Sequence, residues 1–302
     1  MPHHLVIGAG AIGAPVARRL AVRGDRVTVG TRRGTAVPGA TAVALDVADA
    51  EAPTRAADGV DAVFVCSNPP YPDWTAAWPA VTTSLVAAAS ATGATVVLMG
   101  NLYGHAPGVG TMREDTPLAP ATAKGRVRVD TWQRLLAAAD QGVRAVEVRA
   151  SDYFGLAAGG TAHLGSRFFR PLLAGRTAWC VGDPDQLHSW AYLPDVVEAL
   201  VAAADHGGSG RAWLAPHALT MSRREIAEEV RRTTGATGRV RALPAPVWAA
   251  ATAAVPFLRE IRELEYQFRA PFVVDAGRSE RALGIVATPA AEALQATVAS
   301  YR

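Results

Sequence analysis

Apolar and polar residues follow one another along the chain in the pattern of alternating strands and helices. Residues 4–7 form an apolar run typical of a buried strand, residues 14–22 a helix rich in Ala, Val and Leu, and residues 26–29 a second strand. Two strands joined by a helix fit a parallel β-α-β unit, because parallel strands need a crossover of this kind. The first thirty residues therefore predict the opening unit of a parallel sheet.

The same alternation continues through the first half of the chain. It predicts further strands at residues 42–45, 61–66, 95–100 and 144–150, and further helices at residues 78–91 and 126–139. Regular alternation is typical of a doubly wound α/β fold, in which ligands bind at the carboxyl ends of the strands. We expect a Rossmann-like parallel sheet over residues 1–155, with a binding crevice formed by the loops that follow its strands.

The pattern changes after about residue 155. A Gly-rich stretch covers residues 155–165, and a basic aromatic segment follows it at residues 167–170. Beyond these segments we expect short strands at residues 178–181 and 211–214 and helices at residues 194–204, 222–233, 247–254, 260–268 and 288–301. We predict that residues 186–214 return to the sheet, and that residues 156–302 otherwise form a smaller, mostly helical lobe that binds the substrate.

Three glycines lie in the turn between the first strand and the first helix. Gly8, Gly10 and Gly13, with Ala11 and Ile12 between them, form the G-x-G-x-x-G pattern. The first glycine permits the tight turn, the second lets the backbone approach a phosphate, and the third allows close packing of helix and strand. The helix N-terminus adds unpaired N–H groups. We therefore expect these five residues to bind the pyrophosphate of a dinucleotide.

The end of the second predicted strand distinguishes between two dinucleotides. NAD sites place an Asp or Glu there to bind the ribose 2′-hydroxyl. This chain has Thr31, Arg32 and Arg33 instead, which supply two guanidiniums and no carboxylate. A guanidinium suits a phosphate group, although arginines in a loop can also be simply solvated. We therefore expect NADP(H) rather than NAD(H).

Composition narrows the class of protein. The 302 residues are 50% hydrophobic and 19% charged, but no apolar run reaches the roughly 18 residues of a membrane span. The first strand begins too early to leave room for a signal peptide. Two cysteines are too few for a disulfide framework, the histidines lack metal-ligand spacing, and the scattered basic residues do not suggest nucleic-acid binding. We expect a cytoplasmic protein with no metal, membrane or nucleic-acid partner.

Four blocks of the sequence resemble the NAD-dependent epimerase/dehydratase family, a branch of the extended short-chain dehydrogenase/reductase superfamily. They are residues 8–13, residues 102–104 with 114–118, residues 188–196, and residues 274–279 with 283–284. The resemblance extends over nearly the whole chain. It implies a Rossmann-like fold, a nicotinamide cofactor, and proton transfer by a Tyr-x-x-x-Lys pair aided by a Ser or Thr.

The chain departs from this family at the residues that carry the chemistry. Met99 stands where the family has its Ser or Thr, Lys124 replaces the Tyr, and Arg128 replaces the Lys. Lys124 is also the one lysine among the 30 basic residues. Beside a cationic cofactor and Arg128 its charged form would be disfavoured, so that it can act as a proton donor. Binding of a phosphate or the ribose, or plain solvation, are the alternatives for this lysine.

Further candidates surround the same crevice. Tyr103 and Asn101 follow the fifth predicted strand and are candidates for proton donation and for binding a substrate oxygen, respectively. The resemblance implies additional cofactor contacts at Asp46, Ser67, Asn68 and Lys124. It implies substrate contacts at Asp152, Tyr153, Arg167, Phe168, Trp179, His188, Tyr266 and Gln267. Each side chain also has a structural alternative, as a packed aromatic ring, a turn cap or a buried histidine.

Three functions follow from these observations and stay open. The first is an atypical NADP(H)-dependent oxidoreductase of a small carbonyl or alcohol, with protons handled by Lys124, Tyr103 or water. The second is a redox-neutral epimerase, dehydratase or isomerase that uses bound NAD(P). The third is a dinucleotide-sensing module without catalysis, since the Tyr-x-x-x-Lys pair is missing. A homodimer through the helices at residues 78–91 and 126–139 is implied by the resemblance alone.

Overall fold

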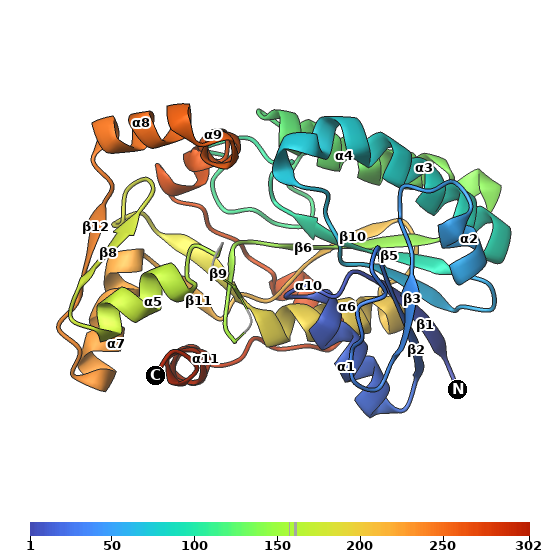
Figure 1. Cartoon of the computed structure of the whole chain (residues 1–302), viewed down its shortest axis with the longest axis horizontal. Helices are drawn as coiled ribbons and strands as arrows, with labels where there is room; N and C mark the ends of the chain where they lie inside the picture. Colours follow the sequence, from blue (N-terminus) through green and yellow to red (C-terminus); the bar gives the residue numbers. More distant parts are fainter. Residues whose placement is uncertain (157, 160–161) are drawn as a thin grey trace.

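A parallel sheet of seven strands organises the larger part of the computed structural model, which describes residues 1–156, 158–159 and 162–302 (Figure 1). The strands run in the order β10-β6-β5-β4-β1-β2-β3. Their bounds are β1 His3–Ile7, β2 Arg26–Thr31, β3 Thr41–Ala44, β4 Ala62–Val65, β5 Thr95–Asn101, β6 Ala145–Ala150 and β10 Arg211–Leu214. The order reverses between β1 and β4, and a ligand crevice is expected at such a switch point.

Helices cover both faces of this sheet (Figure 1). One face carries α1 (Gly13–Arg23), α6 (Leu193–His206) and α10 (Gly277–Leu283), and the other carries α2 (Ala52–Ala56), α3 (Trp74–Thr92) and α4 (Ala123–Ala137). A short 3-10 helix, η1 (Tyr71–Asp73), leads into α3, and η2 (Ala139–Gln141) follows α4. This arrangement confirms the Rossmann-like doubly wound α/β fold.

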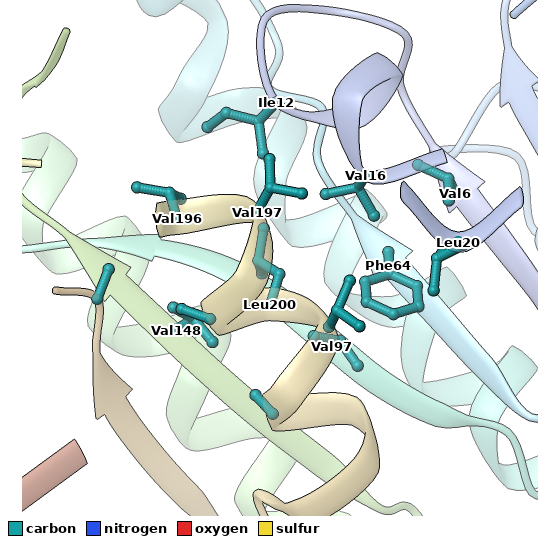
Figure 2. Close-up of a cluster of buried hydrophobic side chains, with 14 of the residues drawn as sticks. Val6, Ile12, Val16, Leu20, Phe64, Val97, Val148, Val196, Val197 and Leu200 are labelled. Carbon is teal, nitrogen blue, oxygen red and sulfur yellow. The ribbon is translucent and has the colours of Figure 1, made fainter. Parts of the chain in front are cut away.

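Apolar side chains of α1 and α6 fill the space beneath the sheet (Figure 2). Val16 and Leu20 of α1 and Leu200 of α6 are fully buried, as are Phe64 of β4 and Val97 of β5. Burial of each such side chain stabilises the fold by about 1.5–3 kcal/mol. Because the sheet is covered on both faces, its central strands are continuous apolar runs. Such runs are easily predicted from the sequence.

The predicted strands of this sheet are confirmed, with every boundary within two residues of the observed one. The predicted return of residues 186–214 to the sheet is confirmed only in part: residues 211–214 pair with β6 as β10, whereas residues 188–192 form β9 of a separate small sheet. Among the helices, α3 begins four residues earlier than expected, at Trp74, and α2 was not predicted at all. A five-residue helix is too short to show a helical period.

Two small sheets and several short helices make up the lobe at the other end of the molecule (Figure 1). One sheet has the order β11-β9-β7 and the other pairs β12 with β8. The strands are β7 Tyr153–Phe154, β8 Thr177–Cys180, β9 His188–Tyr192, β11 Leu219–Met221 and β12 Arg239–Ala242. The helices are α5 Ser166–Leu173, α7 Arg223–Thr234, α8 Ala245–Ala254, α9 Pro256–Arg262, η3 Glu265–Phe268 and α11 Ala290–Ala299.

One predicted helix of the lobe is wrong. Residues 260–268 do not form a single helix, because α9 starts at Pro256 and ends at Arg262, and the separate 3-10 helix η3 follows. Proline favours the first turn of a helix, which explains the early start. The break lets the Glu265 carboxylate accept a hydrogen bond from Trp248 Nε1 at 3.1 Å, a contact that helical period does not reveal.

Two further points concern the described residues as a whole. None of their helices combines the length and the apolar character needed to cross a membrane. Within the Gly-rich stretch, Ala157, Gly160 and Thr161 lie outside the described residues. The division of the chain into two units at residue 155 stays a prediction.

Candidate active site

The glycine turn joins β1 to α1 at the switch point of the sheet. Gly8 has a φ of +106°, and its amide donates a hydrogen bond to the Gly30 carbonyl at 2.9 Å. A Cβ on Gly13 would lie 2.1 Å from the Gly8 carbonyl oxygen, so this turn excludes any side chain there. A Cβ on Gly10 would meet no described atom within 4 Å. The space over Gly10 and the N-terminus of α1 therefore fits a phosphate group.

A cavity of about 330 Å³ opens beside this turn, at the ends of β1, β2 and β4. Arg32 and Arg33 are both exposed, but only Arg32 is among the residues that line the cavity. The predicted cofactor residues that line the cavity are Gly8, Thr31, Arg32, Asp46, Ser67 and Asn68. We call it the adenosine cavity, because its position and its residues fit the adenosine half of a dinucleotide.

A second cavity, of about 200 Å³, lies at the carboxyl ends of β5 and β6 and shares Asn68 with the first. The predicted site residues in its wall are Ile12, Asn68, Asn101, Tyr103, Asp152, Tyr153 and Gln267. We call it the reaction cavity. Asn101 Oδ1 accepts a hydrogen bond from the Tyr103 amide at 3.1 Å, so this side chain also caps its own turn.

Lys124 is not among the residues that line these two cavities. Its side chain is 3% exposed, and its ammonium lies 2.5 Å from Glu260 of α9 and 3.3 Å from Glu263. The Lys124 amide also donates a hydrogen bond to Glu263 at 3.1 Å. The ammonium lies 5.5 Å from the centroid of the Tyr71 ring, which lines the reaction cavity. Lys124 is therefore held by ion pairs with Glu260 of α9 and with Glu263, which directly follows α9.

Arg128 is also buried and faces the core. Its guanidinium stacks 4.6 Å from the Trp78 ring centroid, and Nη2 donates a hydrogen bond to the Met99 carbonyl at 2.5 Å. Glu147 Oε1 lies 3.9 Å from the same nitrogen, and Glu147 also pairs with Arg149 at 2.7 Å. This buried charge cluster holds the end of β5, which carries Asn101 and leads to Tyr103.

Two tyrosine hydroxyls meet in the wall of the reaction cavity. The hydroxyls of Tyr71 and Tyr103 lie 3.0 Å apart. Burial raises the pKa of Tyr71 to about 12 and raises the pKa of Tyr103 well above its ordinary value. Both groups therefore keep their protons at neutral pH, so that they can donate a hydrogen bond to a substrate oxygen but are poor bases.

Asp152 lies in the opposite part of the same wall and contacts His188. The Asp152 carboxylate oxygen Oδ2 lies 3.1 Å from His188 Nε2, and the Ser151 hydroxyl lies 3.3 Å from the same nitrogen. Burial alone would raise the pKa of Asp152, but the contact with His188 and the charge of Arg223 hold it below its ordinary value. The carboxylate is therefore ionised at neutral pH.

The sequence singled out Asp152 and His188 separately but did not predict that they pair. The pairing follows from the register of the small sheet, in which Tyr153 of β7 lies opposite Ala191 of β9. A two-residue strand leaves no detectable pattern in the sequence. Ser151 and His163 also line the reaction cavity and were not predicted; both lie in loops, where no periodic pattern marks them.

The remaining predicted substrate residues lie in the lobe. Arg167, Phe168 and Trp179 line a third cavity of about 240 Å³, which shares His163, Phe257 and Ile261 with the reaction cavity. Tyr266 does not line these cavities; its hydroxyl is buried and has no hydrogen-bond partner among the described residues. His188 lies behind Asp152 and is 2% exposed.

Comparison with known proteins agrees with this architecture. The model of the NAD dependent epimerase/dehydratase family matches residues 4–215. No curated protein sequence matches the chain. Among solved structures, MoeE5 in complex with UDP-glucose and NAD is 21% identical, with 99% of this chain and 98% of that chain covered and a TM-score of 0.80.

Two further solved structures are similar over their whole length. DesIV from Streptomyces venezuelae, a dTDP-glucose 4,6-dehydratase described with NAD bound, is 22% identical, with 99% and 97% of the two chains covered and a TM-score of 0.78. UDP-glucuronic acid 4-epimerase from Bacillus cereus, in complex with UDP-glucuronic acid and NAD, is 14% identical, with 99% and 98% covered and a TM-score of 0.80. At these identities the likeness shows the fold alone.

Proposed function

The chain belongs to the NAD dependent epimerase/dehydratase family, and from this membership we propose that it binds a nicotinamide dinucleotide and transforms a small hydroxyl- or carbonyl-bearing molecule without net oxidation or reduction. One observation carries the proposal. The adenosine cavity beside the glycine turn meets, at Asn68, a reaction cavity whose wall holds Tyr103 and Asp152. A ligand that spans both would place its reactive end beside groups able to move a proton.

The positions of several residues support their proposed role in holding the cofactor. The turn at Gly8, Gly10 and Gly13, with Ala11 and Ile12, would receive the pyrophosphate at the N-terminus of α1. Asp46 would lie beside the adenosine, and Ser67 and Asn68 would line the path between the two cavities. When bound, the nicotinamide would supply a hydride acceptor and donor.

For the cofactor itself we favour NADP(H). The end of β2 offers Thr31, Arg32 and Arg33 and no carboxylate for a ribose 2′-hydroxyl, and Arg32 belongs to the wall of the adenosine cavity. The solved structures named above contain NAD, so this preference is a property that we propose for this chain.

At the reaction cavity, Asn101, Tyr103, Asp152 and Tyr153 are the proposed contacts of the reacting group. Their hydroxyl, amide and carboxylate groups suit hydrogen bonds to a substrate hydroxyl or carbonyl. Lys124, whose ammonium is paired with two carboxylates of the lobe, is poorly placed for the proton transfer that its position in the sequence suggested. The third cavity, with Arg167 and Trp179, would receive the remainder of the substrate.

A net NADP(H)-dependent oxidoreductase is the second candidate function. The observation that favours it is the arginine pair at the end of β2, because enzymes that consume a reduced cofactor commonly need a site for the 2′-phosphate. A dinucleotide-sensing module without catalysis would bind the cofactor and convert nothing.

Purified protein distinguishes these functions in one set of measurements. Released cofactor is identified after denaturation, NADPH and NADH binding is measured by fluorescence titration, and a panel of sugar nucleotides and small carbonyl compounds is followed by NMR and by absorbance at 340 nm. We expect submillimolar dinucleotide binding and product formation without net cofactor consumption. Stoichiometric loss of NADPH would favour the oxidoreductase, and absence of dinucleotide binding would overturn both enzyme proposals.

We also propose a cytoplasmic location and a homodimer through α3 and α4. These two helices pack together on one face of the sheet (Figure 1). Light scattering coupled to size-exclusion chromatography tests the dimer, for which a single-chain mass would be the contradicting result.

A further inference from the structure

The reaction cavity contains one carboxylate among its described lining residues, that of Asp152. The other polar groups in the wall are amides, hydroxyls and the His163 ring. Of these groups, a carboxylate is the one that is ionised and basic at neutral pH without further activation. Because the family's Tyr-x-x-x-Lys pair is absent, the proton of the substrate needs another acceptor.

We propose that Asp152 is the group that takes and returns the substrate's proton, and that His188 is the positioning residue that holds the Asp152 carboxylate in place. The proposal rests on the proposed function, since it assigns a proton acceptor to that same site. It pairs a residue of the loop between β6 and β7 with a residue of β9, and it replaces Lys124 in the role that the sequence suggested.

The His188 ring is held in one orientation. It lies between the Phe268 and Phe272 rings, with centroid distances of 5.0 and 5.1 Å and interplanar angles of 19° and 21°. Nδ1 faces the Gln267 carbonyl at 3.3 Å, and Nε2 faces Asp152 at 3.1 Å. A carbonyl oxygen only accepts, so Nδ1 carries a hydrogen. Nε2 then lies beside Asp152 Oδ2, a buried carboxylate oxygen that has no hydrogen-bond partner among the described residues and can take a proton.

The charges around Asp152 favour its ionised form. Arg223 of α7 is buried, and its guanidinium donates hydrogen bonds to the Val181 and Asp183 carbonyls. His163 has a pKa lowered to about 4 by burial, so it is neutral at pH 7. Four tyrosines also interact electrostatically with the carboxylate, and all of them keep their protons at neutral pH: Tyr71, Tyr103, Tyr153 and Tyr266.

The competing proton acceptors are less suitable. The Lys124 ammonium is paired with Glu260 and Glu263 outside the cavity wall. The Tyr103 hydroxyl is hydrogen-bonded to Tyr71, and burial raises its pKa. Tyr103 is therefore suited to polarise a substrate oxygen, and Asp152 to accept the proton from it.

The proton step balances as follows. When a substrate alcohol is oxidised, its O–H bond breaks and the proton forms a bond to a carboxylate oxygen of Asp152. The electron pair of the O–H bond becomes the second bond of the carbonyl, while the hydrogen on carbon leaves with its electron pair to the oxidised nicotinamide, the co-reactant that gains the two electrons. In the return half of a redox-neutral reaction, Asp152 gives the same proton back.

The pair is tested first without substrate or cofactor. Protein labelled with ¹³C at the aspartate carboxyls is titrated by NMR as wild type, as His188→Gln and as Ser151→Ala, with Asp152→Asn used to assign the Asp152 resonance. We expect the Asp152 titration midpoint to rise by about one pH unit in His188→Gln, because the variant removes the ring that holds the pKa of Asp152 below its ordinary value. It should stay unchanged in Ser151→Ala. An unmoved midpoint in His188→Gln overturns the pair, and His188→Asn serves if the Gln variant does not fold.

The catalytic role is tested with the full chain and the substrate that the panel identifies. Asp152→Asn should lower kcat/KM by about 10²- to 10⁴-fold, while the affinity for NADPH changes less than twofold. Asp185→Asn, which removes an exposed carboxylate paired with Arg224, is the matched control. Activity of Asp152→Asn within threefold of wild type overturns the proposal.

His188→Gln should move the acidic limb of the kcat/KM profile upward in pH by the shift that NMR measures. A purely structural role for His188 predicts no such movement, and a profile that stays in place while the NMR midpoint moves overturns its role in the reaction. If the protein binds no dinucleotide at all, the proposed function fails, and the NMR titration still decides the pair.

Discussion

Gly10 and Gly13 of the glycine turn differ in what an added side chain would meet. A methyl group at position 13 would overlap the Gly8 carbonyl oxygen, whereas one at position 10 meets no described atom. We expect Gly13→Ala to lower the free energy of unfolding by about 3 kcal/mol, as a forced backbone shift does. Gly10→Ala should leave that free energy within about 1 kcal/mol of wild type and weaken NADPH binding at least tenfold, because the methyl occupies the approach of the phosphate.

Urea unfolding and fluorescence titration with NADPH measure the two effects, and each variant serves as the control for the other. The account of the turn would be wrong if Gly10→Ala bound NADPH as tightly as wild type, or if both variants lost the same stability.

Arg32 and Arg33 are expected to set the preference between the two dinucleotides. A charge-assisted hydrogen bond contributes about 1.5–3 kcal/mol. Its loss in Arg32→Ser should therefore weaken NADPH binding by about 10- to 100-fold, with little change for NADH. Arg33→Ser should have a smaller effect, because Arg33 does not line the adenosine cavity.

Fluorescence titrations with both cofactors check this, with the exposed Arg170→Ser as control. Equal weakening for NADPH and NADH would contradict a role in binding the 2′-phosphate.

At the scale of elements, the sequence predicted what is local and repetitive. The strands of the large sheet are long apolar runs between helices. The glycine turn lies between β1 and α1, and Arg32 directly follows β2, because both positions depend only on neighbouring residues in the sequence. The partners of Lys124 could not be predicted in this way. Its partners Glu260 and Glu263 come 136 and 139 residues later in the chain. They reach it only because α9 of the lobe folds over the N-terminus of α4.

The same contact joins α9 to the N-terminus of α4 through one buried lysine. The two glutamate side chains are 28% and 29% exposed, while the Lys124 side chain is buried. Removing the carboxylates leaves a buried charge without its partners, which costs about 3 kcal/mol or more, whereas Lys124→Met removes the buried charge itself and costs less. We therefore expect the double variant Glu260→Gln/Glu263→Gln to be less stable than Lys124→Met.

Urea unfolding ranks these variants, and amide hydrogen exchange in residues 256–262 should rise in both. Exchange that stays at the wild-type rate in Lys124→Met would show that other contacts hold α9, among them the edge contact of Phe257 with Tyr71.

At the scale of the whole molecule, buried titratable groups confine maximal stability to a range around neutral pH. Burial lowers the pKa of His105 and His163 to about 4 and that of His217 to about 3. Burial also raises the pKa of Cys66 and of Tyr71 to about 12. In acid these histidines therefore gain protons at a higher pH in the unfolded chain than in the folded protein. In alkali the thiol and the phenol lose their protons at a lower pH in the unfolded chain.

The sign of the acid effect follows from proton counting. Between about pH 4 and 6.5 the unfolded chain binds up to three more protons than the folded protein, one for each of these histidines, so stability falls as the pH falls through this window. The slope is at most about 1.4 kcal/mol per pH unit for each histidine. Above pH 9 the unfolded chain loses the thiol and phenol protons first, so stability falls as the pH rises.

We therefore expect the urea midpoint to be highest near pH 7.5 and lower at both pH 5 and pH 10, with a reductant present throughout.

His217 tests the acid limb, because neither of its buried ring nitrogens has a partner among the described residues. His217→Phe should reduce the slope between pH 5 and 6.5 by about one proton and raise stability at pH 5, since a ring that cannot be protonated replaces one that unfolding protonates. The exposed His206→Phe should leave that slope unchanged. A wild-type slope in His217→Phe would show that His217 does not contribute to the loss of stability between pH 5 and 6.5, which would then have to come from the other buried histidines, His105 and His163.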